Sequence, residues 1–210
     1  AGFGVKNGQK VLVTTSTHIY CPPKKWQDQS LEEIERKFQT GRAAIIGSAC
    51  RDPEKLSMPE RERFVAAREK ADLTLIEADG AKHLPCKAPA EHEPAFLMGS
   101  DLVVGVTGLL ALGQPIGKTC FRAELAAELL GCTMDHCITE EDLVQLIASE
   151  RGQQKDLDGR TFYAVLHQYE EKEHREAAQK TVELLQRKGI EHVLVTCVAE
   201  SQMQSNAGKN

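Results

Sequence analysis

Two carboxylates, Glu77 and Asp79, stand two residues apart directly after an apolar run of the sequence. Gly80 comes next, and Lys82 follows two positions later. Phosphate-transferring α/β proteins hold Mg²⁺ with one or two carboxylates after a buried strand, because the ion keeps several of its waters. A glycine lets the backbone approach a phosphate, and a lysine supplies a positive charge. These residues predict a catalytic site in which Glu77 and Asp79 bind the metal. The competing interpretation is that Glu77 pairs with a neighbouring cation and that Asp79 and Gly80 form a turn.

Hydroxyl-bearing side chains follow another apolar run, KVLVTTS, at residues 10–16. Thr14, Thr15 and Thr17 lie at its end, and His18 comes next. The hydroxyl of Thr15 or Thr17 could complete the coordination of a metal held by carboxylates. His18 has two open interpretations, a neutral imidazole near phosphate or a loop histidine hydrogen-bonded within the protein. We count all four residues as candidate nucleotide- or phosphate-binding residues.

The elements that must position these side chains are short strands that alternate with helices. Runs rich in apolar and β-branched residues predict strands at 10–16, 43–47, 71–78, 101–107, 161–167 and 192–198. Apolar residues at helical spacing predict helices at 31–40, 59–71, 121–130, 139–149 and 171–188. Ser30 is an expected N-cap, and Thr139 begins a capping-box pattern with Asp142. The segment before Lys10 is expected to be the end of a helix that closes on Gly8.

Nearly continuous apolar strands between helices indicate a parallel sheet that is covered on both faces. The predicted fold is therefore a doubly wound, mostly parallel α/β sheet flanked by helices. We expect a single domain over residues 1–199 and a flexible tail at 200–210. Ligands bind such sheets beyond the carboxyl ends of the strands. Polar clusters follow the predicted strands at 14–18, 77–82, 107–108 and 167–170, which predicts a pocket at that edge.

The stretch GQPIGKT, Gly113–Thr119, is close to the phosphate-loop pattern GxxxxGK[ST]. Its spacing is short by one residue, because Leu112 stands where the first glycine is required. Pro115 also removes a backbone N–H from a loop whose N–H groups would bind phosphate. We therefore predict an ordinary connection into a helix here, and no phosphate binding.

Composition excludes several classes of function. The net charge of −5 gives no electrostatic support for binding nucleic acid or membrane surfaces. No run of 18 apolar residues and no signal peptide is found, so a cytoplasmic location away from membranes is expected. Seven cysteines without a CxxC pair indicate neither a disulfide framework nor a zinc ribbon. Cys132 and Cys137, which flank His136, are interpreted as thiols rather than metal ligands.

Three longer stretches carry a resemblance to a known family. VLVTTSTHIYCP, LIEADGAKHLPCKAPAEHEP and DLVVGVTGLLALGQPIGKTCFR together resemble the selenium-dependent hydroxylase accessory family (YqeC type). Similarity continues through ITEEDLVQLI and the terminal strand, so the resemblance covers nearly the whole chain. It implies a P-loop NTPase-like fold, Mg²⁺ with ATP or GTP as cofactor, and a role in the maturation of selenium-dependent molybdenum hydroxylases. A molybdenum hydroxylase or its cofactor-handling proteins are the implied partners.

The resemblance also implies roles for particular residues. Glu77 and Asp79 correspond to a Walker-B-like acidic pair. One signature loop is implied to contain the residues Lys82, Lys87, Glu91, His92 and Glu93. Lys87 is counted as a phosphate-binding candidate.

Three departures from the family pattern affect these assignments. Members usually carry a glycine-rich GKT loop ahead of the strand at 10–16, and we expect that loop to lie upstream of Ala1. The family's late strand tends to end in Asn-Gln-x-Asp, whereas this chain has His167-Gln168-Tyr169-Glu170. Gln168 and Glu170 remain candidates for contacting a purine base. A His-Arg pair of the family is Phe121-Arg122 here, so Arg122 alone carries over as a possible anion contact.

Three functions remain open at this point. The first is a Mg-nucleotide-binding accessory protein with NTP hydrolase or phosphotransferase activity. The second is a non-catalytic module that binds a cofactor or a partner protein and lacks a working phosphate loop. The third is a metal-dependent hydrolase that uses His83, Cys86 and His92 of the signature loop.

Overall fold

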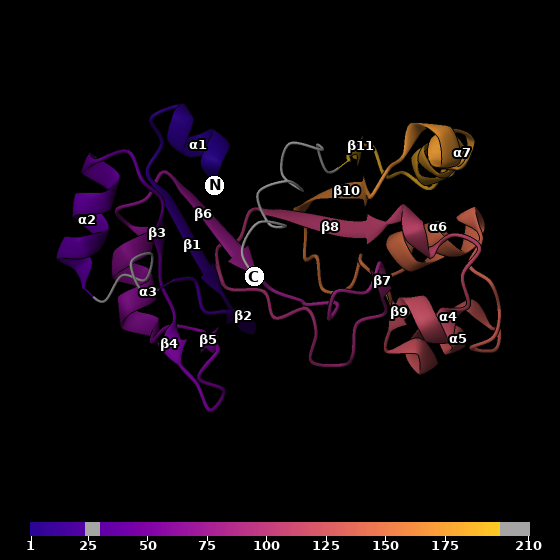
Figure 1. Ribbon diagram of the computed structural model, residues 1–210, viewed down its shortest axis with the longest axis horizontal. Coiled ribbons are helices and arrows are strands. Elements are labelled where there is room, and N and C mark those ends of the chain that lie inside the picture. The colour runs from indigo at the N-terminus through magenta and orange to yellow at the C-terminus, as the bar shows by residue number, and fades with distance from the viewer. Residues whose placement is uncertain (24–29, 198–210) are drawn as a thin grey trace, which may run out of the picture. The chain divides into compact units, whose positions relative to one another are not determined.

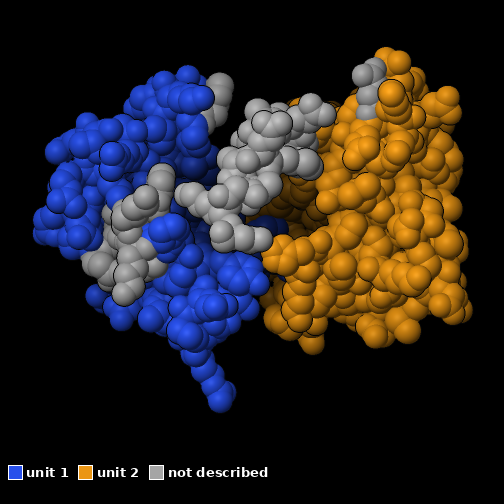
Figure 2. Space-filling model, viewed as in Figure 1, with its two compact units in different colours: residues 1–80, 95–97 blue, residues 81–94, 98–210 orange. Residues whose placement is uncertain are grey.

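The computed structural model describes residues 1–23 and 30–197. The chain divides into two compact units, residues 1–80 with 95–97 and residues 81–94 with 98–210 (Figure 2). Each unit combines helices with a parallel three-stranded sheet, which confirms the predicted α/β class. The single domain over 1–199 and the doubly wound, P-loop-like arrangement stay predictions. The tail at 200–210 lies outside the described residues.

The first unit is built around a parallel three-stranded sheet with the order β3-β1-β6 (Figure 1). A short antiparallel sheet with the order β2-β5-β4, which the sequence analysis did not predict, accompanies it. The elements are α1 (Gly2–Lys6), β1 (Val11–Thr15), β2 (His18–Tyr20), α2 (Leu31–Gln39), β3 (Ala44–Ile45), β4 (Ser48–Ala49), β5 (Lys55–Ser57), α3 (Arg61–Arg68) and β6 (Leu73–Glu77).

Local sequence accounts for α2 and its place on the sheet. The Ser30 side chain accepts a hydrogen bond from the backbone N–H of Glu33, and the Glu33 carboxylate accepts one from the N–H of Ser30. This capping box satisfies N–H groups that the first turn leaves without helical partners. The helix buries Ile34 and Phe38. The core that they join consists of Leu12, Ile34, Phe38, Ala44, Ile46, Phe64 and Ala67.

The second unit contains a parallel three-stranded sheet with the order β11-β10-β8 and a parallel pair, β7-β9 (Figure 1). All seven residues of β10 pair with β8, from Thr161 opposite Leu102 to His167 opposite Gly108. The elements are β7 (Cys86–Lys87), β8 (Leu102–Gly108), the 3₁₀ helix η2 (Leu109–Ala111), α4 (Ile116–Thr119), β9 (Cys120–Phe121), α5 (Ala123–Leu130), α6 (Glu140–Ala148), β10 (Thr161–His167), α7 (Glu171–Arg187) and β11 (Val193–Val195).

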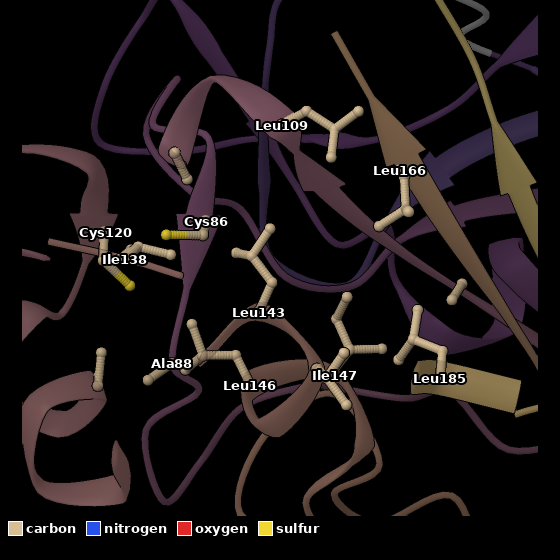
Figure 3. Close-up of a cluster of buried hydrophobic side chains, with 14 of the residues drawn as sticks. Cys86, Ala88, Leu109, Cys120, Ile138, Leu143, Leu146, Ile147, Leu166 and Leu185 are labelled. Carbon is tan, nitrogen blue, oxygen red and sulfur yellow. The ribbon is translucent and has the colours of Figure 1, made fainter. Parts of the chain in front are cut away.

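The core of the second unit lies between its sheet and the helices of the two crossovers. Figure 3 shows Leu109 and Leu166 from the sheet region facing Leu143, Leu146 and Ile147. These last three side chains come from α6, whose predicted capping box between Thr139 and Asp142 is present. At its C-terminus, α5 ends at Gly131, whose φ of 69° lies in the left-handed region that glycine adopts without strain.

One expectation about the sheets is not met within the second unit. Val104 and Val106 of β8 keep about half of their surface exposed, at 52% and 55%. The crossover helices of this unit therefore cover one face of its sheet and leave the other without cover from the same unit.

Across the described residues, none of the helices is both long enough and apolar enough to cross a membrane.

Candidate functional site

An acid–hydroxyl cluster lies at the carboxyl ends of β1 and β6 in the first unit. The parallel register places Thr15 directly opposite Glu77. The Thr15 hydroxyl donates to Glu77 Oε2 at 2.7 Å, and the Thr17 hydroxyl donates to the same oxygen at 2.5 Å. The backbone N–H of Thr17 donates to Thr15 Oγ1 at 2.9 Å, which fixes the turn after β1. The predicted proximity of Glu77 to both threonines is therefore present.

The two carboxylate oxygens of Glu77 differ in their contacts. Only Oε2 accepts side-chain hydrogen bonds from the described part of the chain. A Cβ atom at Gly80 would lie 3.4 Å from Oε1, in ordinary van der Waals contact, so Gly80 lies beside this oxygen. Glu77 could thus offer one oxygen to a metal while two hydroxyls orient the other. Asp79 follows β6 by two residues, and within residues 1–23 and 30–197 no group of three or more His, Cys, Asp or Glu side chains forms a ready metal site.

Two other candidates from the first strand do not join this cluster. Thr14 is buried, and its hydroxyl donates to the carbonyl of Ile46 at 3.0 Å. This bond links β1 to the chain that follows β3, so the Thr14 side chain has a structural role. His18 is exposed, and its backbone pairs with Ser57 in the antiparallel sheet.

A second candidate cluster surrounds Glu93 in the signature loop of the second unit. Arg122 binds the Glu93 carboxylate with two parallel hydrogen bonds, Nε to Oε2 and Nη2 to Oε1, both at 2.9 Å. The Lys87 ammonium lies 2.9 Å from Oε2, and the Ala90 N–H donates to the same oxygen at 2.9 Å. The Lys87 and Glu93 side chains are only 8% and 14% exposed, so water screens their attraction little. The structure therefore joins three sequence-predicted residues, Lys87, Glu93 and Arg122.

The protonation of Glu93 follows from these contacts. Burial by itself raises the pKa of the Glu93 carboxyl, but the bonds from Arg122, from the Ala90 N–H and from Lys87 lower that pKa to about 2. The group is therefore a carboxylate at neutral pH, and it holds both cations in place.

The Phe121 ring lies at the centre of three cations. Lys82 Nζ, Lys87 Nζ and Arg122 Cζ are 4.7, 5.1 and 5.0 Å from the ring centroid. These distances permit cation–π attraction to the electron-rich face of the ring. The three cations and Glu93 sum to a charge of +2, which favours an anion near this cluster. Phe121 was not predicted as a site residue, because in the sequence it stands out only as a departure from the family pattern.

The backbone at several candidate residues is in the left-handed region, which side chains other than glycine rarely adopt. Lys82 has a φ of 49°, and His83, next along the loop, has a φ of 65°. Arg122 has a φ of 62° and Gln168 a φ of 59°. Such conformations cost free energy and cluster at functional sites, where the surrounding structure maintains them. Three of these four residues, Lys82, Arg122 and Gln168, were predicted from sequence as site residues.

The signature loop is also held by a residue that the sequence analysis missed. Lys155 donates to the backbone carbonyls of Glu91 and Glu93 at 2.9 and 2.8 Å. The Glu91 and His92 side chains themselves are exposed. No local pattern marks Lys155, because it lies 62 residues from Glu93 in the sequence.

The end of β10 contains an acceptor without a partner. Gln168 Oε1 is buried and receives no hydrogen bond from the described residues. It packs against Gly108, where a Cβ atom would come within 2.0 Å of this oxygen. Glu170 is exposed, and its backbone N–H donates to His174 Nδ1 at 3.1 Å. Gln168 and Glu170 therefore both follow β10, the first with a buried amide oxygen and the second exposed.

In the GQPIGKT stretch, backbone N–H groups that would bind phosphate in a phosphate loop are hydrogen-bonded to carbonyl groups of the protein. The backbone N–H groups of Gly113, Ile116 and Gly117 donate to the carbonyls of Ile138, His136 and Met134. The Gln114 N–H donates to the carbonyl of Ala111, and the Lys118 N–H donates to the carbonyl of Pro115. This pattern agrees with the prediction that the stretch does not bind phosphate.

The thiols and histidines that could suggest a metal do not assemble into a metal site. His136 Nε2 lies 2.7 Å from Asp142 Oδ2, which also accepts from Thr139. The described residues contain no group of three potential ligands around Cys132 and Cys137 or in the signature loop. This speaks against the metal-dependent hydrolase with His83, Cys86 and His92.

Taken together, fold and clusters define an α/β protein with parallel sheets and charged loops at the carboxyl ends of their strands. A model of the family described as "YqeC protein" matches residues 4–124, more than half of the 210-residue chain. The chain belongs to this family. It is 30% identical over 159 residues to the "Uncharacterized protein YqeC" of Escherichia coli (strain K12). That alignment covers 72% of this chain and 62% of the relative's length. No solved structure matches the chain.

Proposed function

We propose that the protein is a Mg-nucleotide-binding accessory protein that serves the maturation of selenium-dependent molybdenum hydroxylases. The observation that carries nucleotide binding is the Glu77 carboxylate, oriented by the Thr15 and Thr17 hydroxyls at the carboxyl ends of two parallel strands. This is where parallel α/β sheets bind their ligands. The role in hydroxylase maturation rests on membership of the YqeC family.

The chemistry of the residues fits this proposal. Mg²⁺ prefers oxygen ligands and keeps most of its waters, so Glu77 with a threonine hydroxyl, directly or through water, is a sufficient donor set. The bound ion would neutralise charge on phosphate oxygens. Thr15 and Thr17 orient Glu77 through Oε2, and Gly80 lies beside Oε1, the oxygen that we propose for the metal. Asp79 is proposed as a second, water-mediated acid.

The cationic cluster of Lys82, Lys87 and Arg122 around Phe121 independently favours an anionic ligand. Glu93 compensates one of the three charges and fixes the positions of Lys87 and Arg122. We propose these three cations as phosphate contacts within the second unit, with Gln168 and Glu170 as further candidates of that unit. His18 is proposed as a peripheral contact of the Glu77 cluster in the first unit. Hydrolysis or transfer of a phosphoryl group belongs to the same proposal.

Calorimetric titration with Mg-ATP and Mg-GTP tests the proposal. We expect Glu77→Gln to weaken binding of the preferred nucleotide at least about tenfold, roughly 1.4 kcal/mol, because a neutral amide is a poorer magnesium ligand. Glu62→Gln is the matched control, since Glu62 is exposed in the first turn of α3, away from the cluster. Equal affinities of both variants, or no heat with either nucleotide, would contradict the site.

A second candidate function is a non-catalytic module that binds a cofactor or partner protein. The observation that favours it is the GQPIGKT loop, whose N–H groups are already bonded within the protein and cannot receive β- and γ-phosphates. Release of inorganic phosphate from ATP or GTP separates the two functions. Nucleotide binding without phosphate release would support the module, whereas release that is lost in Glu77→Gln would support the enzyme.

A further inference from the structure

Two buried cysteines lie side by side in the second unit. Cys86 of β7 and Cys120 of β9 are direct partners in the parallel register, and both are at most 3% exposed. The Cys86 thiol donates to the carbonyl of Thr119 at 3.4 Å, and the Cys120 thiol donates to the carbonyl of Phe121 at 3.7 Å. Figure 3 shows both sulfur atoms in the same region of the hydrophobic cluster. Neither the proposed nucleotide site nor the ion pairs of the signature loop use these thiols.

The backbone geometry suits a covalent link. Neighbouring strands lie about 4.7–4.9 Å apart, and disulfides join Cα atoms that are about 4.4–6.8 Å apart. Directly opposed residues of paired strands point their side chains to the same face. The usual spacing of paired strands therefore lies within the range of Cα separations that a disulfide spans.

We propose that Cys86 and Cys120 form a reversible disulfide, which makes the β7–β9 pair a redox site that takes a peroxide as its oxidant. The two-residue strands are short enough to open locally, which admits a molecule as small as hydrogen peroxide. The disulfide would then join the two chain segments immediately before Lys87 and Phe121, where the cationic cluster begins.

The two thiols differ in the way that such a reaction requires. Interaction with the neighbouring Cys86 thiol lowers the pKa of Cys120, although burial opposes this change. Interaction with Cys120, together with burial, raises the pKa of Cys86. Because the thiolate is the nucleophile, Cys120 is the attacking residue and Cys86 the resolving residue.

The reaction balances in two steps. The Cys120 sulfur attacks one peroxide oxygen, the O–O bond breaks, and the departing oxygen takes the thiol proton to leave as water. The Cys86 sulfur then attacks the sulfur of the resulting sulfenic acid. The S–O bond breaks, the S–S bond forms, and a second water leaves with the Cys86 proton. Two thiols lose two electrons, and one peroxide is reduced to two waters.

Peptide mapping of the full chain tests the proposal. Reduced protein is exposed under native conditions to a few equivalents of hydrogen peroxide, and remaining thiols are then blocked with iodoacetamide in denaturant. Trypsin releases Cys86 in HLPCK and Cys120 in TCFR. We expect a disulfide-linked peptide whose mass is two hydrogens less than the summed masses of the two peptides, and which disappears with dithiothreitol. Its amount should be at least about ten times that of any linked peptide containing the exposed Cys137.

Two variants check the roles of the thiols. In Cys86→Ala, the Cys120 sulfenic acid should persist and be trapped by dimedone, whereas Cys132→Ala, the matched control, should still form the link. If Cys86→Ala fails to fold, the wild-type map decides alone. The proposal is overturned if Cys86 and Cys120 both carry iodoacetamide in protein whose Cys137 has been oxidised. It is also overturned if the disulfide forms only in denaturant.

Discussion

At the scale of the residue, Glu93 is the most constrained ionisable group of the signature loop. Its carboxylate accepts two bonds from Arg122 and lies against the ammonium of Lys87, which is almost fully buried. The pKa of Glu93 in the folded chain, about 2, lies below its ordinary value of 4.5. The carboxylate therefore stabilises the fold above pH 4.5, and this contribution is lost as the pH falls from about 4.5 to about 2.

We predict that Glu93→Gln lowers the free energy of unfolding by about 3 kcal/mol at pH 7, because Lys87 loses its counter-ion in a buried place. The difference from wild type should shrink as the pH is lowered from 6 to 3. Urea unfolding followed by circular dichroism at several pH values measures both effects. Glu128→Gln is the control, since the Glu128–Arg151 pair is about two-thirds exposed and should cost less than about 1 kcal/mol. If Glu93→Gln lowers the free energy of unfolding no more than Glu128→Gln does, or by an amount that does not change with pH, the ion pairs do not stabilise the loop.

Contacts between site residues could be predicted from the sequence where the two residues lie on neighbouring strands. Thr15 and Glu77 could be predicted to meet, because both end apolar runs that pair in parallel. Lys155 and Phe121 could not, because each reaches the signature loop through tertiary packing that leaves no periodic signal. Thr14 was assigned to the same side as its neighbours, but successive residues of a strand point to opposite faces, and its hydroxyl binds Ile46 instead.

At the scale of the element, strong local patterns were the most informative part of the sequence. The strand predicted at 161–167 has the same bounds in β10, and both predicted N-caps are present. The antiparallel sheet β2-β5-β4 and the pair β7-β9 were missed, because strands of two or three residues are too short to show alternation. Their pairing is decided by the loops that enclose them rather than by their own sequence.

The capping box of α6 gives a prediction at this scale. The Thr139 hydroxyl accepts from the N–H of Asp142, and the Asp142 carboxylate accepts from the N–H of Thr139 and lies 2.7 Å from His136. Thr139→Ala should therefore lower the free energy of unfolding by about 1 kcal/mol. Chemical denaturation of the variant measures this loss. Thr133→Ala, an exposed threonine of the preceding turn with no cap to lose, should change stability by less than about 0.5 kcal/mol. Equal effects of both changes would mean that the cap contributes nothing specific.

At the scale of the whole molecule, the two compact units each contribute one of the clusters. The acid–hydroxyl cluster belongs to residues 1–80, and the cationic cluster around Phe121 belongs to residues 81–94 and 98–210. The alternation of strands and helices predicted the parallel sheets of both units. The division itself could not be predicted, because residues 95–97 return to the first unit after the signature loop without a shift in composition.

Ligand-linked stability tests the proposed function on the intact chain. A ligand that binds only the folded protein stabilises it by about 2.7 kcal/mol at a hundred times its Kd, which corresponds to about 5–10 °C in the midpoint of thermal unfolding for a chain of this size. We therefore expect Mg-ATP or Mg-GTP, but not the nucleotide with EDTA, to raise the midpoint in thermal scans followed by circular dichroism. Lys118→Ala should keep this rise, because the N–H groups of Gly113, Gln114, Ile116, Gly117 and Lys118 are already bonded within the protein. Glu77→Gln should reduce it. A rise that survives Glu77→Gln and disappears in Lys118→Ala would move the nucleotide to the GQPIGKT loop and contradict the site at β1 and β6.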